Sequence, residues 1–211
     1  MKEYFVINIG RQLGSGGKDI AAIIARRLGI RVYDKELINL AAEQSGLCAE
    51  FFEKADEKES RNVLSTMIGY LRSPFAGSCT NVPNVLSNDA LFQIQSDVIR
   101  DLAEKESCIF VGRCADYILR EHPRRVDVFI SADDGDRIRR ICDRLGCTAE
   151  EARAQMERGD TRRADYYNYY SSKTWGAAST YHLCINSSVF GDEGTADFIL
   201  DFASRKLGMK F

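Results

Sequence analysis

The chain has 211 residues, a length that suits one α/β domain with a substantial core and is short for two. Its net charge of −2 gives no overall field that would hold a nucleic-acid backbone, and no apolar run approaches the ~18 residues of a membrane-spanning helix. Seven cysteines without a C-x-x-C pair, and only two histidines, indicate neither a zinc ribbon nor a disulfide framework. We therefore expect a cytoplasmic protein with reduced thiols and with neither nucleic acid nor membrane as a partner.

Strand and helix patterns alternate from the start of the chain. Residues 4–9 (YFVINI) are β-branched and aromatic and predict a strand, and after a glycine cluster residues 19–28 predict a helix that ends at Gly29. Residues 31–33 predict a second strand and residues 35–45 a second helix.

The middle of the chain is more polar. Residues 49–72 predict a helix with a solvated surface, and residues 73–88, which hold two of the three prolines, are the best candidate for a mobile excursion. Residues 89–105 predict a helix, and residues 108–111 (CIFV) and 126–130 (VDVFI) predict buried strands.

The last third continues the alternation. A basic helix is expected over residues 136–145, capped by Ser131 or Asp133, and Thr148 with a glutamate three residues later predicts a capping box that opens the next helix. Residues 181–185 predict a fifth strand and residues 192–207 a closing helix. Alternating strands and helices predict a parallel sheet that is covered by helices on both faces.

A glycine-rich segment, GRQLGSGGKD, joins the first strand to the first helix at residues 10–19. Glycines allow a phosphate to approach backbone N–H groups, and a helix N-terminus attracts anions, so this position favours phosphate binding over a merely tight turn. The dinucleotide pattern G-x-G-x-x-G fails, because Gly14 and Gly16 would need a third glycine where Asp19 stands.

The Walker pattern G-x-x-x-x-G-K-[ST] is met only in part. With Gly17 and Lys18 as its G-K, Gln12 takes the place of the first glycine and Asp19 that of the hydroxyl residue. In the other register Gly14 begins the usual G-S-G, Gly17 replaces the lysine, and Lys18 takes the hydroxyl position. Both registers remain open at the level of sequence.

The whole chain resembles the cytidylate kinase-like family of P-loop nucleoside monophosphate kinases. The segments that carry the resemblance, in order from residue 7 to 188, are INIGRQLGSGGKDIA, LGIRVYDKELI, IFVGRCADYIL, RVDVFISADDGDRIRRI, GDTRRADYYNYY and YHLCINSS. The resemblance implies a three-layer α/β/α P-loop NTPase fold with a five-stranded parallel sheet. It also implies one domain over residues 1–211, with a helical acceptor-binding insertion at about 46–95 and a lid-like region at about 147–178.

The resemblance also implies roles for individual residues. The donor nucleotide, ATP, would be bound by the loop and the start of the helix, namely by Gly14, Ser15, Gly16, Gly17, Lys18 and Asp19. The acceptor would be bound by Asp34, Arg113 and Asp160. Catalysis would depend on cationic side chains that stabilise the transferred phosphoryl group, namely Lys18, Arg113, Arg137, Arg162 and Arg163, with Arg140 also on the lid side.

Metal binding departs from the usual pattern. No Ser or Thr follows Lys18, and the strand at residues 108–111 ends without an acidic residue. Asp19 and Asp34, beside the loop, are the candidate ligands for Mg²⁺, directly or through water.

Several residues have competing explanations. Arg137 lies on a helix whose isoleucines face the core, so it is either a site residue or solvated surface, and Asp34 is either a site residue or an ordinary helix cap. Tyrosines 166, 167, 169 and 170 either stack on a base, pack the helix onto the body of the protein, or form an interface in a homo-oligomer.

The function expected is ATP-dependent phosphoryl transfer to a nucleoside monophosphate such as CMP, or to a related small phosphorylated acceptor. The alternative is a regulatory module that binds nucleotides without turnover because its loop is degenerate.

Overall fold

The computed structural model describes residues 4–34 and 88–211. The chain divides into two compact units, one formed by residues 1–33 and 103–211 and the other by residues 34–102. The first unit contains the sheet and most of the helices that the structure describes.

Several sequence predictions lie outside the described residues: the helices at 35–45 and 49–72, the excursion at 73–88, and most of the insertion at 46–95. The insertion and the lid-like region stay predictions.

Five strands form one parallel sheet, in the order β2-β3-β1-β4-β5. In chain order they are β1 Val6–Arg11, β2 Arg31–Tyr33, β3 Cys108–Val111, β4 Arg125–Ser131 and β5 Leu183–Asn186. The α/β fold with a five-stranded parallel sheet is therefore confirmed. Because β1 is central, the segment that follows it emerges at the carboxyl edge of the sheet between β3 and β4, where α/β proteins bind ligands.

The described helices are α1 Gly17–Leu28, α5 Asn88–Lys105, α6 Ala115–Ile118, α7 Asp134–Leu145, α8 Ala149–Ser171 and α9 Ser187–Leu207. The short helix α6 was not predicted. Helix α9 begins five residues before the predicted start at 192, and the difference has a local cause: Gly191 interrupts the helix with φ 65° and ψ −177°. None of the helices in the described part of the chain is long and apolar enough to cross a membrane.

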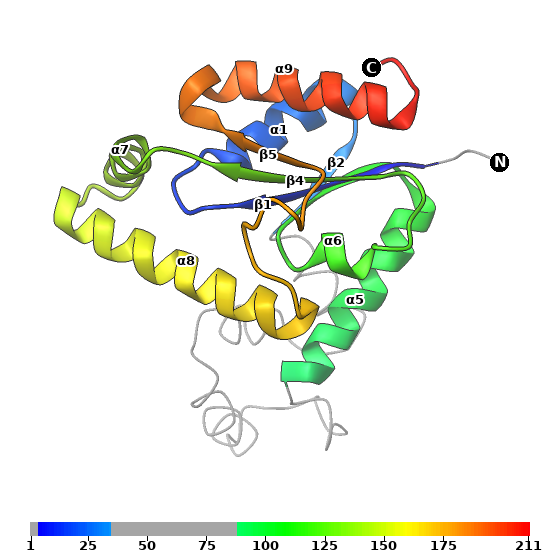
Figure 1. The fold of residues 1–211 in the computed structure, drawn as a ribbon, viewed down its shortest axis with the longest axis horizontal. Coiled ribbons are helices and arrows are strands. Elements are labelled where there is room, and N and C mark those ends of the chain that lie inside the picture. The colour runs from blue at the N-terminus through cyan, green and yellow to red at the C-terminus, as the bar shows by residue number, and fades with distance from the viewer. Residues whose placement is uncertain (1–3, 35–87) are drawn as a thin grey trace, which may run out of the picture. The chain divides into compact units, whose positions relative to one another are not determined.

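One face of the sheet carries the main hydrophobic core. Side chains alternate along β1, so Ile7 and Ile9 point to one face and pack with Ile20 and Ile24 of α1 and Ile199 of α9. All five are at most 1% exposed. Figure 1 shows α1 and α9 together on this face, with α6 and α8 on the opposite side of the sheet. The core fixes α1 directly after β1 and so determines the shape of the turn between them.

Helix α8 begins at the predicted capping box. The Thr148 hydroxyl accepts a hydrogen bond from the amide of Glu151, and the Glu151 carboxylate accepts one from the amide of Thr148. Asp133 is the N-cap residue of α7, as predicted, although its carboxylate accepts its hydrogen bond from Asn186 at 2.8 Å instead of from the helix.

Candidate functional site

The segment between β1 and α1, residues 10–18, is here called the glycine loop. Two of its residues, Gly14 with φ 80° and Gly16 with φ 75°, adopt left-handed backbone conformations that favour glycine. The side chain of Ser15 is buried, and its amide and hydroxyl both donate to the carbonyl of Gln12, at 3.3 and 2.9 Å. The Ser15 carbonyl accepts a hydrogen bond from the Ser187 hydroxyl at 2.7 Å. The loop is thus held in one shape by its own turn and by the start of α9.

The N-terminus of α1 completes the loop. The first amide that reaches an acceptor one helical turn back is that of Ile20, which donates to Gly16 at 2.9 Å. The amides of Gly17, Lys18 and Asp19 therefore have no acceptor within the helix. Such amides, aligned with the helix dipole, form a site for a phosphate group.

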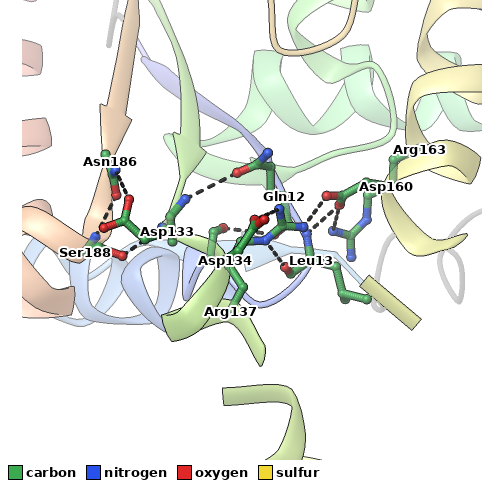
Figure 2. A network of polar contacts seen from close by, with 11 residues as sticks. Gln12, Leu13, Asp133, Asp134, Arg137, Asp160, Arg163, Asn186 and Ser188 are labelled. Atoms are coloured by element: carbon green, nitrogen blue, oxygen red, sulfur yellow. Dashed lines mark hydrogen bonds and ion pairs between the residues drawn. The ribbon is translucent and has the colours of Figure 1, made fainter. Parts of the chain in front are cut away.

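Helices α7 and α8 hold the loop through side chains that contact its backbone (Figure 2). The Leu13 amide donates to Asp160 Oδ1 at 2.7 Å, and the Leu13 carbonyl accepts from Arg137 Nε at 2.8 Å. Arg137, which is only 5% exposed, also forms an ion pair with Asp160. Arg163 Nη1 donates to the carbonyl of Arg11 at 3.2 Å. Three predicted site residues thus meet at the loop, where their contacts hold its backbone in place.

A second arginine of α7 lies against the N-cap of α1. A Cβ atom at Gly16 would overlap Nη1 of Arg140 and lie 2.7 Å from Oδ1 of Asp192, so only glycine leaves room for this ion pair. Arg140 Nη2 and Asp192 Oδ1 are 2.6 Å apart, whereas Arg140 Nη1 is buried with no hydrogen-bond partner among the described residues. A buried guanidinium N–H without an acceptor, next to a helix N-terminus, suits an anion at this position.

The remaining predicted cations come from three elements. Lys18 is exposed in the first turn of α1, Arg162 is exposed on α8, and Arg113 follows β3 with a left-handed φ of 60°. The acceptor residue Asp34 belongs to the second compact unit. The roles predicted for these four residues stay predictions.

Metal binding also stays a prediction. Asp19 is half exposed, and its Oδ2 lies 3.1 Å from Arg144 Nη2 in a surface ion pair. The described residues contain no group of three or more His, Cys, Asp or Glu side chains that would hold a metal ion by themselves. Mg²⁺ in phosphotransferases is bound by one or two carboxylates together with substrate phosphates, so a lone carboxylate beside the loop fits that chemistry.

An acidic side chain of α6 and two tyrosines, one of them on α8, lie close together. The Tyr167 hydroxyl of α8 donates to Oδ2 of Asp116 at 2.5 Å, and the ring of Tyr167 stacks on that of Tyr181 at 6.2 Å. Burial raises the pKa of Asp116 to about 6, against the lowering effect of the bond from Tyr167. Burial and the nearby Asp116 charge also raise the pKa of both tyrosines. Tyr167 therefore packs α8 onto the body of the protein, which is one of the predicted alternatives, whereas Tyr169 is 70% exposed.

Sequence reasoning missed one residue of the loop, Arg11, and two residues that contact the loop, Ser187 and Asp192. Arg11 is the last residue of β1 and forms a Gly-Arg pair with Gly10 after a buried apolar run, the same signal that singled out Arg113, so it could have been found. Ser187 and Asp192 reach the loop from the far end of the chain, and no local pattern indicates that contact.

Comparison with solved structures finds related folds. A crystal structure of an uncharacterized protein from Eubacterium ventriosum matches with a TM-score of 0.70 at 26% identity, covering 95% of this chain and 98% of that chain. Shikimate kinase from Bacteroides thetaiotaomicron matches at 0.54 and 11% identity, covering 97% and 99%. Shikimate kinase from Acinetobacter baumannii, in complex with shikimate, matches at 0.51 and 13%, covering 95% and 93%.

No curated protein matches the chain. The model of the cytidylate kinase-like family matches residues 6–189, most of the chain, as the sequence motifs predicted. On that match and on the fold and glycine loop described above, the protein belongs to the cytidylate kinase-like family.

Proposed function

We propose that this protein is an ATP-dependent phosphotransferase that acts on a nucleoside monophosphate or a related small phosphorylated acceptor. The observation that carries the proposal is the glycine loop, whose left-handed Gly14 and Gly16 lead directly into the N-terminus of α1. Membership in the cytidylate kinase-like family supports the same reaction class.

The charges around the loop suit phosphoryl transfer. Lys18, Arg113, Arg162 and Arg163 come from the first turn of α1, the end of β3 and the middle of α8. In such a reaction catalysis consists mainly of positioning and of stabilising charge on the transferred group. In this proposal Lys18 and Arg113 bind phosphate oxygens, while Arg137 and Asp160 position the loop through the backbone of Leu13.

The residues present fit ATP and Mg²⁺. The first amides of α1 and the buried, unpartnered Nη1 of Arg140 offer donors to phosphate oxygens. Asp19 is the residue beside the loop that would hold the metal. Asp34, the other predicted ligand, belongs to the second compact unit. When bound, Mg²⁺ would neutralise charge on the nucleotide phosphates.

A binding panel tests the first half of the proposal. Thermal unfolding is measured with ATP, ADP, GTP and CMP, each with and without Mg²⁺, and a nucleotide at 100 times its Kd is expected to stabilise the protein by ~2.7 kcal/mol. ADP release in a coupled assay then distinguishes acceptors, with nucleoside monophosphates in one set and phosphorylated non-nucleotides in another. If no nucleotide shifts the unfolding temperature, the proposal is wrong.

Lys18→Ala tests the loop lysine. We expect this variant to lose at least ~100-fold in turnover, the size of effect seen when one donor to the reacting group is removed. Lys206→Ala, an exposed lysine on α9, is the matched control and is expected to keep full activity. Full activity in Lys18→Ala would favour the second register of the loop, in which Gly17 occupies the lysine position.

A second function, nucleotide binding without turnover, is favoured by one specific observation. The position after Lys18, where a P-loop enzyme places its metal-binding hydroxyl, holds Asp19, and its carboxylate is engaged by Arg144 at 3.1 Å. This alternative predicts stabilisation by ATP that does not depend on Mg²⁺, and no ADP release with any acceptor.

A further inference from the structure

The side chain of Arg11 runs from the start of α1 to the end of β3. A Cβ atom at Gly17 would lie 2.7 Å from Cβ and 3.0 Å from Cγ of Arg11, so the arginine's stem lies against the first residue of α1. A Cβ atom at Gly112 would overlap Nη1 of Arg11 and lie 3.2 Å from its Cζ, so the guanidinium lies against the residue after β3. The absence of side chains at residues 17 and 112 is what leaves room for Arg11.

The backbone fixes both ends of this path. β1 and β3 are adjacent and parallel, with Ile9 opposite Val111, and the amide of Gly112 donates to the carbonyl of Ile9 at 3.0 Å. The carbonyl of Arg11 accepts the bond from Arg163 at 3.2 Å. Arg11 is therefore anchored at its main chain and along its stem, and its charged end has a defined place.

The guanidinium of Arg11 lies between the positions proposed for the donor phosphates and for the acceptor. On one side is the N-terminus of α1, where the donor phosphates are proposed to bind, and on the other is Gly112, which precedes the proposed acceptor residue Arg113. A guanidinium is planar, remains charged at all working pH values, and binds phosphate oxygens through two parallel N–H groups.

We propose that Arg11 is a catalytic residue that binds the terminal phosphoryl group of ATP as it passes from the loop to the acceptor. This rests on the proposed function. It assigns to Arg11 some of the charge stabilisation that a hydroxyl-bound metal gives in loops of the full Walker pattern. Glycine at residue 17 leaves room for the stem of Arg11, and glycine at residue 112 both leaves room for its guanidinium and suits a left-handed φ of 78°.

The test compares two nucleotides that differ by one phosphate. Affinities for ADP and for a non-hydrolysable ATP analogue are measured by titration calorimetry on the full chain, for the wild type, Arg11→Gln and Arg11→Lys. We expect Arg11→Gln to bind the ATP analogue about 10-fold more weakly or worse, with ADP changed by less than about 3-fold, because a charged hydrogen bond to the terminal phosphate is lost. Arg11→Lys keeps a charge and much of the stem, so its affinity for the ATP analogue should lie between those of the wild type and Arg11→Gln.

Two further variants complete the experiment. Arg205→Gln removes an exposed arginine of α9 that pairs with Asp201, and it should change neither affinity. Gly112→Ala keeps Arg11 but displaces its guanidinium, and it should weaken binding of the ATP analogue selectively, as Arg11→Gln does. Alanine is also strained at the φ of 78° found here, a cost that would appear in thermal unfolding and would affect both nucleotides alike.

The outcomes separate the two proposals. If the wild type binds neither nucleotide, the proposed function fails and this inference with it. If the wild type binds both and Arg11→Gln weakens both equally, or neither, the function stands and the role of Arg11 is wrong. Thermal unfolding of each variant shows whether a loss of affinity comes from misfolding. If Arg11→Gln is misfolded, Arg11→Lys, which retains the stem against Gly17, is used in its place: selective weakening of the ATP analogue supports the role of Arg11, and equal or no weakening of the two nucleotides contradicts it.

Discussion

At the scale of single residues, the raised pKa of Asp116 makes the stability of the protein depend on pH. Its carboxylate accepts a hydrogen bond from the hydroxyl of Tyr167, and burial raises the pKa of Asp116 from 3.8 to about 6. The folded protein therefore binds the proton of Asp116 more tightly than the unfolded chain does. The stabilisation is fully present below a pH of 3.8, the pKa expected in the unfolded chain, and is lost as the pH rises through about 6.

Asp116→Asn should remove this pH dependence, because an amide accepts the same bond without a charge. Between pH 4 and pH 7, the free energy of unfolding of the variant should rise relative to that of the wild type by at most ~3 kcal/mol. This limit corresponds to a pKa shift of about two units at 1.36 kcal/mol per unit. Urea unfolding at several pH values measures this difference, in which groups common to both proteins cancel. A difference that stays constant over this range would show that the carboxyl group is not buried as described.

The backbone of the glycine loop can be tested with two alanine substitutions. Gly14 has φ 80°, and a Cβ atom there would lie 2.7 Å from the carbonyl oxygen of Arg137, which is backbone and cannot move cheaply. Gly29, the C-cap of α1, has φ 64° but nothing within 4 Å of such an atom. We expect Gly29→Ala to cost ~1 kcal/mol of stability and Gly14→Ala at least ~1 kcal/mol more, measured by urea unfolding. Equal costs would mean that α7 does not contact the loop at Gly14.

At the scale of elements, the capping box determines where α8 begins. Thr148→Ala removes the hydroxyl that accepts a hydrogen bond from the Glu151 amide, and should lower the free energy of unfolding in urea by ~1 kcal/mol. The matched control is Thr161→Ala, since the Thr161 hydroxyl is exposed and donates to the Glu157 carbonyl within the helix at 2.8 Å. That substitution should be neutral or slightly stabilising, because alanine is the better helix former. Similar losses in both variants would argue against a special role for the cap.

Elements with a strong local pattern were predictable from the sequence, and others were not. The apolar run at 108–111 predicted β3 with the same residues, and Thr148 with Glu151 predicted the start of α8. Helix α6 has four residues, too few to show a hydrophobic period, and the order of strands depends on contacts between distant segments. Local order was thus available from the sequence, whereas strand order was not.

The site divides in the same way. Its glycine loop was evident from the order of strand, glycines and helix. The burial of Arg137 was not, because an arginine beside the isoleucines of an amphipathic helix looks the same whether solvent or a second helix covers it. Packing of α8 against α7 decides between the two, and Asp160 supplies the charge that makes the buried position tolerable.

At the scale of the whole molecule, α8 joins parts of the chain that are far apart in sequence. Asp160 and Arg163 bind the backbone of the glycine loop, and Tyr167, further along the same helix, binds Asp116 beyond the end of β3. Gly159 lets α8 approach closely, because a Cβ atom there would lie 2.7 Å from Cδ2 of Leu13. A change in α8 should therefore be felt at the loop, without any direct contact between the altered residue and a ligand.

The pair of Arg137 and Asp160 is where that linkage can be measured. The two side chains are 5% and 17% exposed, so removing either partner leaves the other in a poorly solvated position, and Asp160→Ala alone should cost ~3 kcal/mol or more. In a double-mutant cycle with Arg137→Met, we expect a coupling of about 1 to 3 kcal/mol in urea unfolding. The exposed pair of Arg205 and Asp201 on α9 is the matched control and should give less than ~0.5 kcal/mol. In an exposed pair, water can solvate the charge that remains after its partner is removed, so the coupling energy is small. Equal coupling in both pairs would therefore mean that the pair of Arg137 and Asp160 is not buried and that α8 does not hold the loop through this contact.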